Sequence, residues 1–389
     1  MTMRPMQMNP PRSRRGGVAL LATLVAVLLL SILVAAVTRL VTGDFRRARD
    51  EGAMRSAADA ADAGAYSVMR DWASRPHESV AVGGVLGPDT LRLTSARVVT
   101  RTMRTSNTAF WTVSESESGD SLSHTLSRRL ANVAYRLAIP DLIANAALTV
   151  RDSIKLAGSA RVVGADTSLT AWGASCGPLA SGAAVAMRDT TRLCDGGCGR
   201  GSVAGRATGA PPLLADSSAA DTARYRVFGA ERWGTLTPHA AVILPPGSVV
   251  TPAPIVASGV CDRTRSDNWG DPSGAGLCGT YAPLIWARGD VEVRGGVGQG
   301  VLLAEGDVTL SAGARFVGVV IARDDLTSTG IGGTVLGAAL AGDERQSSGD
   351  HTSLSGSTLV RRSSCAIALA FERSARLVPV RARAWAVLR

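Results

Sequence analysis

The sequence is poor in the side chains that most often bind nucleic acids or metals. It contains 4 His, 5 Phe, 7 Trp and 4 Tyr among 389 residues. Single-stranded nucleic acid is usually bound by a basic surface with interleaved aromatic rings, on which the bases stack. The small number of aromatic residues disfavours this class of protein. The scarcity of histidine likewise disfavours a histidine-based metal centre.

Positive charge is concentrated at the two ends of the chain, which has a formal net charge of +10. The basic leader, residues 1–17, has four arginines and no acid, and residues 361–389 have an excess of six positive charges. The residues between them therefore carry no net charge. We interpret the leader as an orienting signal for a membrane segment and the C-terminal end as a solvated basic tail. DNA binding by this tail is the alternative.

Charge is absent from residues 18–37, an apolar run that only Thr23 and Ser31 interrupt. Twenty helical residues span about 30 Å of hydrocarbon. A secretory signal normally has an apolar region of about 7 to 15 residues, whereas this run is longer and continues into Thr38. We therefore expect a transmembrane helix over 18–37, with signal cleavage near Ala35 as the alternative. The leader arginines predict a cytoplasmic N-terminus and an extracytoplasmic remainder.

The helical pattern continues beyond the membrane run. Apolar residues recur at intervals of three and four residues as far as Trp72, which predicts an extracytoplasmic stem helix over 38–75 that Pro76 ends. Its second half, RSAADAADAGAYSVMRDW, is rich in Ala and Gly. Such small residues let a neighbouring helix approach closely, or they let the stem pack on its own domain.

From 76 to 139 the period of the pattern changes to two. The stretches TLRLTSARVVTRTM, AFWTVSESES and TLSRRLANVAYRLAI alternate in polarity, as strands do when one face is buried. We predict a small antiparallel sheet over these residues, packed on the stem helix.

Four copies of one turn recur in the second half of the chain. ARGD, AEGD, ARDD and AGDE begin at Ala287, Ala304, Ala322 and Ala341. Each of the first three is followed by a short strand pattern and, after a corner that contains Gly, by an apolar strand ending at the next Ala. A repeat of about eighteen residues with two strands is typical of a β-solenoid, in which each coil buries its face against its neighbours.

One earlier stretch has the same pattern: VRDSIKLAGSARVVG (150–164) aligns without a gap on AEGDVTLSAGARFVG (304–318). The predicted fold is thus α+β and membrane-anchored, with a long N-terminal helix, a small antiparallel sheet and a C-terminal β-solenoid over 140–389. Residues 165–280 are expected to form a disulfide-clipped insertion between the first coil and the main stack, or an irregular continuation of that stack.

Six cysteines lie in the segment predicted to be outside the cytoplasm, where disulfides persist. They are Cys176, Cys194, Cys198, Cys261, Cys278 and Cys365. We expect the first five to supply clips on long loops, because Cys261 and Cys278 flank a loop rich in polar residues and Cys176 shortly precedes CDGGC. Six cysteines allow fifteen pairings. A zinc site is the alternative, but the C-x3-C spacing has no histidine nearby.

Two patterns in the repeat turns suggest chemistry. Arg288-Gly289-Asp290 spells a cell-attachment tripeptide, but the other copies of this turn read EGD and RDD, so we interpret it as structural. Asp290, Asp307 and Asp325 could form a catalytic or Ca²⁺-binding ladder. The alternating charges of Arg288, Glu305 and Arg323 offer a simpler way to relieve repulsion between stacked acids.

The loop at 342–357 contains Asp, His and Ser within a few residues, but closeness in sequence is not the geometry of a catalytic triad. Its composition is that of a surface loop. We predict no catalytic residue, no metal site and no cofactor.

The leader and stem resemble those of PilX-type pilus assembly proteins, minor pilin-like subunits of type IV pili and related secretion machines. The resemblance rests on RRGGVALLATLVAVLLLSILVAAV, in which a basic leader ends in Gly before the apolar helix, and on the Ala-rich stem. It covers about residues 12–75. The predicted strands and the tail RLVPVRARAWAVLR fit this family more loosely.

The resemblance implies cleavage by a prepilin peptidase after Gly17, with Gly16 as the alternative. Val18 would then be the new N-terminus and a site for methylation. Major pilins carry Glu at the fifth mature position, which here is Ala22. Minor subunits at or near the filament tip resemble this chain in lacking that Glu.

The implied function is that of a non-enzymatic minor subunit of a type IV pilus or secretion pseudopilus. The implied partners are the lipid bilayer, other pilin-like subunits, the pilus assembly machinery and prepilin peptidase. The alternative is a single-pass membrane protein whose β-solenoid binds or cleaves envelope polysaccharide. Both hypotheses place the chain in the cytoplasmic membrane with its C-terminal part in the periplasm or outside the cell.

Overall fold

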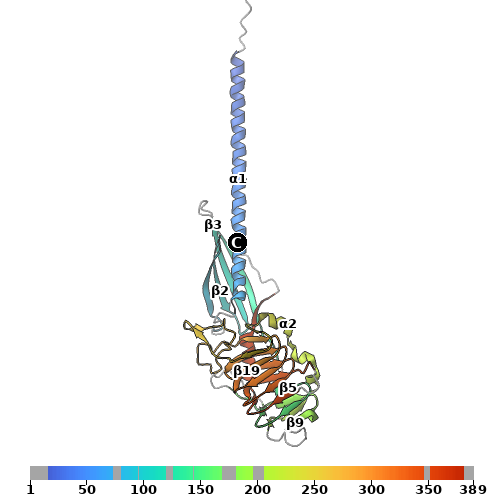
Figure 1. Ribbon diagram of the computed structural model, residues 1–389. Helices are drawn as coiled ribbons and strands as arrows, with labels where there is room; N and C mark the ends of the chain where they lie inside the picture. The colour runs from blue at the N-terminus through green and yellow to red at the C-terminus, as the bar shows by residue number, and fades with distance from the viewer. Residues whose placement is uncertain are drawn as a thin grey trace, which may run out of the picture.

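The computed structural model describes residues 16–72, 80–94, 96–119, 126–142, 144–168, 181–195, 206–345 and 351–380. A single helix, α1 (Gly16–Arg70), extends far out of the rest of the molecule (Figure 1). Its 55 residues correspond to a length of about 80 Å. The helix has no proline that would break it, and it runs without interruption from the predicted membrane segment into the predicted stem.

An antiparallel sheet of five strands packs against the inner half of α1. Its order is β1 (Val85–Arg92), β2 (Ala96–Arg104), β3 (Ala109–Gly119), β4 (Leu126–Ala138) and β27 (Arg376–Pro379). The stretch TLRLTSARVVTRTM forms parts of two strands instead of the one predicted. The Leu93 amide donates to the Ala96 carbonyl at 2.9 Å and closes a tight turn. This turn lacks the Gly or Asn by which hairpin turns are usually recognised.

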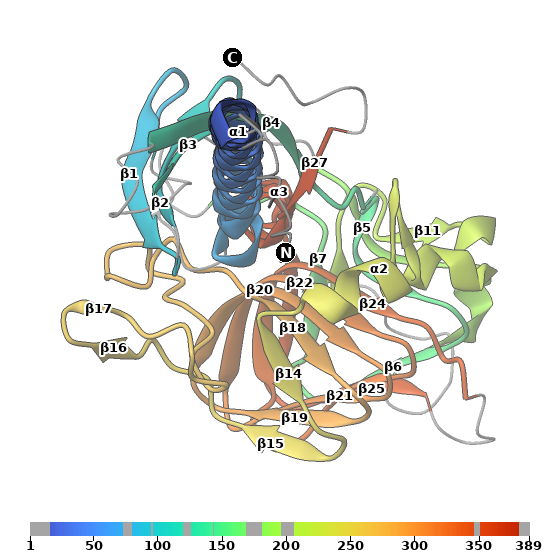
Figure 2. The ribbon, with the colours of Figure 1, turned by 90° about the horizontal axis from the view of Figure 1, so that it is seen from above.

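Two parallel sheets make up most of the remaining molecule (Figure 2). The first contains β14 (Val242–Leu244), β18 (Leu284–Ala287), β20 (Val297–Ala304), β22 (Ala314–Ala322), β24 (Gly333–Ala341), β26 (Leu359–Arg362), β7 (Arg161–Val163) and β10 (Ala207–Thr208), with β5 (Ala146–Val150), β8 (Ala183–Met187) and β11 (Leu213–Ala215) alongside. The second contains β15 (Ser248–Val250), β19 (Val291–Arg294), β21 (Val308–Ser311), β23 (Leu326–Ser328), β25 (Thr352–Leu354), β6 (Ile154–Leu156) and β9 (Leu193–Asp195).

The chain alternates between these two sheets, so that successive strands form coils. The predicted repeat has a direct counterpart in this arrangement. The four alanines that begin the repeat turns, Ala287, Ala304, Ala322 and Ala341, are paired in register across β18, β20, β22 and β24. Apolar side chains of both sheets, among them Val308, Leu326 and Val335, fill the space between them and are fully buried.

A column of glycines lets neighbouring coils approach closely. Gly300, Gly318 and Gly337 are in register and have φ values of 120°, 132° and 143°. A Cβ on Gly318 would lie 2.0 Å from the Gly300 carbonyl oxygen, and one on Gly337 would lie 1.8 Å from the Gly318 carbonyl oxygen. The strands of the first sheet therefore require glycine at this position in each of these coils.

The early coil, residues 146–163, lies beside the last of the four repeats in the two parallel sheets. Its strands β5, β6 and β7 pair with β24, β25 and β26 of the last repeat. On their other side they pair with β8, β9 and β10. The chain therefore returns over 216–241 to the opposite end of the sheets, where β14 and β15 pair with β18 and β19. The two segments contribute to one continuous pair of sheets.

The C-terminal segment joins the two parts of the molecule. Helix α3 (Ser364–Ser374) is capped at its N-terminus by Ser363, whose hydroxyl oxygen accepts from the Ala366 amide at 3.2 Å. Its Ile367 and Phe371 pack on the outer face of β20, β22 and β24. Strand β27 follows directly and pairs with β4. Among the described residues, the remaining short elements are β12 (Val227–Phe228), β13 (Glu231–Arg232), α2 (Trp233–Leu236), β16 (Val256–Ala257), β17 (Val260–Cys261) and the 3-10 turns Thr190–Arg192, Ser217–Ala220, Thr222–Tyr225 and Thr237–His239.

Candidate functional sites

The outer half of α1 is an exposed apolar rod. It belongs to the one helix in the described part of the chain that is long and apolar enough to cross a membrane. Its large apolar side chains from Leu20 to Phe45 are between 45% and 69% exposed. The hydroxyls of Thr23, Ser31 and Thr38 donate to carbonyls of the same helix, at 2.9, 2.8 and 2.7 Å. These polar groups are satisfied internally, as an apolar surrounding requires.

The residues of the predicted processing site lie at the start of this helix. Gly16, Gly17 and Val18 belong to its first turn, and residues 1–15 of the leader lie outside the described residues. Ala22 is exposed on the apolar rod. This position presents a methyl group, not a carboxylate, at the surface of the rod.

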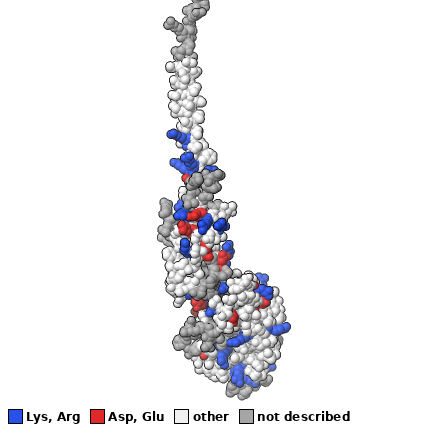
Figure 3. Space-filling model, turned by 90° about the vertical axis from the view of Figure 1, so that its left-hand side faces the viewer, with Lys and Arg blue, Asp and Glu red and all other residues white. Residues whose placement is uncertain are grey.

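A band of charged residues separates the apolar rod from the folded part of the molecule (Figure 3). It comprises Arg39, Asp44, Arg46, Arg47, Arg49, Asp50, Glu51 and Arg55. Arginine side chains at this level can reach lipid headgroups while the apolar rod stays in hydrocarbon. The band therefore marks the expected boundary of the membrane.

The inner half of α1 uses its small residues to pack on its own sheet. Ala57, Ala61 and Ala65 are at most 1% exposed and lie against the antiparallel sheet. Besides apolar residues such as Val98 and Phe110, β2 and β3 bury a group of small hydroxyl side chains: Thr100, Thr102, Thr112, Ser114 and Ser116. Of the two uses predicted for the Ala-rich stem, contact with its own domain accounts for these alanines.

Direct hydrogen bonds hold the helix backbone on the sheet. The Tyr135 hydroxyl donates to the Ala65 carbonyl at 2.7 Å, and the Ser116 hydroxyl donates to the Ala57 carbonyl. Gly64 faces the sheet so closely that a Cβ there would lie 2.4 Å from both Ser114 Oγ and Val98 Cγ1. The stem is therefore rigidly attached to the domain, so that α1 and the sheet form a single unit.

The acidic residues of the repeat turns form a ladder that links adjacent coils. The Asp307 amide donates to Asp290 Oδ1 at 2.9 Å, and the Asp325 amide donates to Asp307 Oδ1 at 3.0 Å. The Thr352 hydroxyl donates to Asp325 Oδ1 at 3.1 Å. Each carboxylate thus serves as a hydrogen-bond acceptor for the next coil.

Arg345 relieves the repulsion within this ladder. Its guanidinium lies 2.7 Å from Asp290 Oδ1 and 3.2 Å from Asp307 Oδ1, and it also pairs with Asp324. Burial raises the pKa of Asp290, but the hydrogen bond from the Asp307 amide and the proximity of Arg345 outweigh it, so that the pKa lies below its usual range. Arg345 lies outside the repeated motif, which is why the sequence did not point to it.

The predicted charge relief by Arg288, Glu305 and Arg323 is wrong. The Arg288 guanidinium stacks 4.9 Å from the centre of the Trp286 ring, and Glu305 accepts from the Trp286 indole at 3.1 Å. Arg323 pairs with Glu344 at 2.8 Å. These side chains turn away from the ladder because better partners lie beside them. The charged ends of the tripeptide at 288–290 are thus both engaged, Arg288 with Trp286 and Asp290 with the Asp307 amide and Arg345.

Asp325 is the most strongly perturbed acid of the ladder. It is 4% exposed. Burial, with smaller contributions from Asp343, Asp324 and Asp307, raises its pKa to about 6, although the bond from Thr352 opposes the shift. Oxygen atoms of Asp307, Asp324 and Asp325 lie within 4.8 Å of one another. Arg345 already supplies positive charge to two of these three acids, so the geometry is that of an internal ion-pair network.

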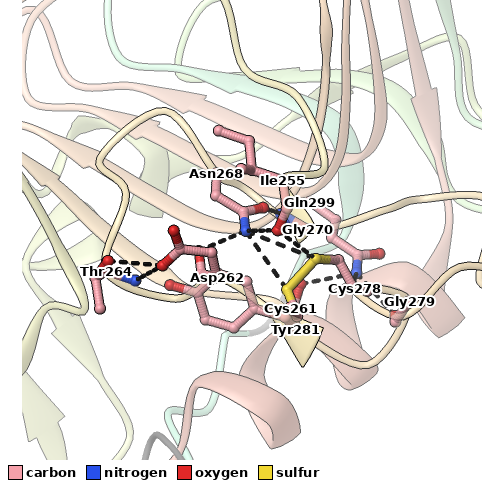
Figure 4. The surroundings of a disulfide bond; sticks show 10 residues. All are labelled: Ile255, Cys261, Asp262, Thr264, Asn268, Gly270, Cys278, Gly279, Tyr281 and Gln299. Atoms are coloured by element: carbon pink, nitrogen blue, oxygen red, sulfur yellow. Dashed lines mark hydrogen bonds between the residues drawn. A yellow bond between two sulfur atoms is a disulfide. The ribbon is translucent and has the colours of Figure 1, made fainter. Parts of the chain in front are cut away.

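A disulfide joins Cys261 to Cys278 with an S–S distance of 2.06 Å (Figure 4). It closes the polar loop that the two cysteines flank. The side chain of Asn268 is completely buried inside this loop and donates to the carbonyls of Ile255 and Asp262, at 2.9 and 2.7 Å. The side-chain oxygen of Asn268, Oδ1, accepts from the Gly270 amide at 3.1 Å. The loop is thus fixed both covalently and by buried hydrogen bonds.

The other cysteine candidates are less fully described. Cys176 and Cys198 lie outside the described residues, and Cys194 is in strand β9. Cys365, which was not among the five predicted, also takes part in a disulfide. In the 342–357 loop, His351 Nδ1 lies 2.9 Å from the Ser153 hydroxyl, and this exposed pair has no third member among the described residues.

No protein-family model matches this chain, and no curated protein sequence matches it. A match among solved structures is the crystal structure of the competence-associated pilin ComZ from Thermus thermophilus. It is 13% identical, and the alignment covers 87% of this chain and 96% of that one, with a TM-score of 0.20. At that score the two structures do not superpose well enough for the similarity to support an argument about fold or function.

Proposed function

We propose that the chain is a membrane-inserted, non-enzymatic, minor pilin-like subunit of a type IV pilus or related secretion pseudopilus. The observation that carries the proposal is the continuity of α1. A simple anchor needs only an apolar span and any linker, whereas here one unbroken helix joins the exposed apolar rod to residues buried on the sheet. Such a rigid stem can pass from the bilayer into a helical bundle of similar subunits.

The apolar rod must be shielded from water both in the membrane and in a filament. Lipid covers it in the membrane, and helices of neighbouring subunits would cover it in a filament. Burial of apolar surface stabilises by about 25 cal/mol per Å², so leaving the bilayer for water is prohibitively unfavourable. If assembly machinery moves the rod from the bilayer directly into a helical bundle, the rod is never exposed to water.

We further propose that the coils form a β-solenoid displayed outside the cytoplasm, at the filament tip or in the periplasm. The in-register parallel pairing of Ala287, Ala304, Ala322 and Ala341 supports the solenoid. The leader arginines support the orientation. Ala22, in place of an acid, supports a minor subunit over a bulk one.

Site-specific photo-crosslinking tests this function. A photoreactive residue at Leu30, 66% exposed on the apolar rod, is compared with one at Ile331, 65% exposed at a corner of the coils. In cells that carry the pilus machinery, we expect Leu30 to yield covalent adducts with other pilin-like subunits and Ile331 to yield none. Adducts of Leu30 with lipid alone would contradict the proposal and favour the anchored, polysaccharide-binding alternative.

A further inference from the structure

Four arginines lie where the apolar rod ends. They are Arg39, Arg46, Arg47 and Arg49, and all four side chains are exposed. None of these side chains forms a hydrogen bond or an ion pair with a residue that the structure describes, whereas Arg55 further along the helix lies 3.9 Å from Glu51. A guanidinium has five N–H donors and stays charged in proteins. The end of the rod therefore presents donors and positive charge without a partner.

The charges of the band are not spread evenly around the helix. Arg39, Arg47 and Arg49 point within about 100° of the direction of Arg46, as follows from 3.6 residues per turn. Asp50 is the one acid of the band on this side. The other charged residues of the band point about 140–180° away from Arg46: Asp44, Glu51 and Arg55. One face of the band, here called the basic face, thus has four positive charges against one negative charge.

The basic face lies on the same side of α1 as the antiparallel sheet. Arg46 precedes Gly64 by about five helical turns, so the two residues point in the same direction. Gly64 in turn faces Ser114 and Val98 of the sheet. Figure 3 views the molecule from the side of the sheet and shows basic side chains at the end of the rod. Because α1 and the sheet form a single unit, a partner on the basic face would fix the orientation of the sheet.

The depth of these arginines matches the headgroups of a bilayer. Leu40 and Phe45, which are 68% and 69% exposed, continue the apolar surface past Arg39. From Val18 to Phe45 the helix rises by about 42 Å, and a bilayer with its headgroups is about 40–45 Å thick. Arg46 and the arginines after it therefore begin at the level of the outer headgroups. The long side chain of Arg39 can extend to the same level.

We propose that the basic face binds the phosphates of anionic phospholipids in the extracytoplasmic leaflet. Arginine suits this partner because its planar guanidinium donates two parallel hydrogen bonds to a phosphate. A zwitterionic headgroup is a poorer partner, because its own positive charge lies beside the arginines. The bound lipids would hold α1 at one depth and one rotation in the membrane. This inference rests on the membrane insertion of the rod proposed above.

Lipid retention by the full chain tests the proposal. The chain is held on an affinity resin in a mild detergent and equilibrated with micelles that contain equal amounts of phosphatidylglycerol and phosphatidylcholine. After washing, the bound lipids are eluted and quantified by mass spectrometry. One arginine near an anionic surface corresponds to about a fivefold preference, so we expect phosphatidylglycerol to be enriched by at least about fivefold.

Two triple substitutions locate the site. Arg46→Gln, Arg47→Gln and Arg49→Gln together should reduce the enrichment to less than about twofold, because glutamine preserves the helix but carries no charge. The matched control replaces three exposed arginines of other elements by glutamine: Arg136, Arg161 and Arg315. The control loses the same net charge and should retain the full enrichment. Equal retention of the two lipids by the original chain, or equal enrichment in the two triple variants, would overturn the proposal.

Two further measurements separate the possible outcomes. Inorganic phosphate, added in excess over the lipid phosphate, should leave the enrichment in place, because free phosphate has no acyl chains to hold it at this depth. Displacement of phosphatidylglycerol by phosphate would identify a site for free anions and refute the proposal. Flotation with phosphatidylcholine vesicles tests insertion itself. A chain that does not float would refute both insertion and lipid binding, whereas a chain that floats without enrichment would refute the lipid preference alone.

Discussion

At the scale of single residues, Gly64 sets the distance between the stem and the sheet. The position has room for a hydrogen atom only, because a Cβ would lie 2.4 Å from Ser114 Oγ and Val98 Cγ1. Both of these side chains are fully buried, so they cannot easily move away. Elsewhere in the same helix, Gly52 has no atom within 4 Å of the corresponding position. The two glycines thus have opposite roles in the same element.

We therefore expect opposite effects from the same substitution. Gly64→Ala should lower the free energy of unfolding by about 1–3 kcal/mol through overpacking. Gly52→Ala should leave it unchanged or raise it by up to about 1 kcal/mol, because alanine favours the helix. Chemical denaturation of both proteins measures the difference. Equal stability of the two variants would show that the stem does not contact the sheet at Gly64.

Asp325 predicts a dependence of stability on pH. Its pKa in the folded protein is about 6, above the usual value of 3.8, so the folded protein binds this proton more tightly than the unfolded chain does. The contribution of Asp325 to stability is therefore largest below pH 4 and is lost as the pH rises to 6. A shift of this size corresponds to a loss of about 3 kcal/mol.

Replacement by asparagine separates this effect from the other acids of the ladder. Asp325→Asn mimics the protonated side chain and retains an acceptor for Thr352. The variant should gain stability relative to the original protein between pH 4 and 6, as measured by chemical denaturation at each pH. A stability difference that does not change with pH would refute the raised pKa.

At the scale of elements, the coils depend on inward-facing apolar residues. Val308 is completely buried in β21, in register with Val291 on one side and Leu326 on the other. Val249 in β15 belongs to the same sheet but faces outward and is 53% exposed. The two positions allow an identical substitution in two environments.

Val308→Asp should destabilise the protein by at least about 3 kcal/mol, because it buries a charge without a partner. Val249→Asp should change stability by less than about 1 kcal/mol, as is usual for surface positions. Thermal unfolding of both proteins distinguishes the outcomes. An unchanged melting temperature for Val308→Asp would show that the register of the coils is different.

Many of these strands were predictable, because the residues of the turns between them recur in the sequence. The repeated turns predict the strands that flank them; they begin at Ala287, Ala304, Ala322 and Ala341. The alternation of polar and apolar residues with a period of two predicted the antiparallel sheet. The spatial position of the early coil at 150–164 was not predictable. Its similarity to 304–318 shows that both form the same kind of coil, but every coil offers similar edges, so similarity does not say which coils are neighbours.

The ladder shows the same limit. The repeat identified Asp290, Asp307 and Asp325, but Arg345, which neutralises the ladder, has no counterpart in the other copies.

At the scale of the whole molecule, the chain is organised around the long helix α1. Its outer half is exposed and apolar, and its inner half is fastened to the antiparallel sheet. The C-terminal strand β27 connects that sheet to α3 and the coils (Figure 2). The molecule therefore transmits a force on the outer helix directly to the folded part. The extraction from a membrane that we propose would require such a connection.

Processing of the N-terminus tests the pilin-like account most directly. The full chain is co-expressed with a prepilin peptidase, and its intact mass and N-terminal sequence are compared with those of chain produced without the peptidase. The account predicts a protein that starts at Val18 only when the peptidase is present. An unprocessed Met1, or a start near Ala36 in both samples, would contradict it.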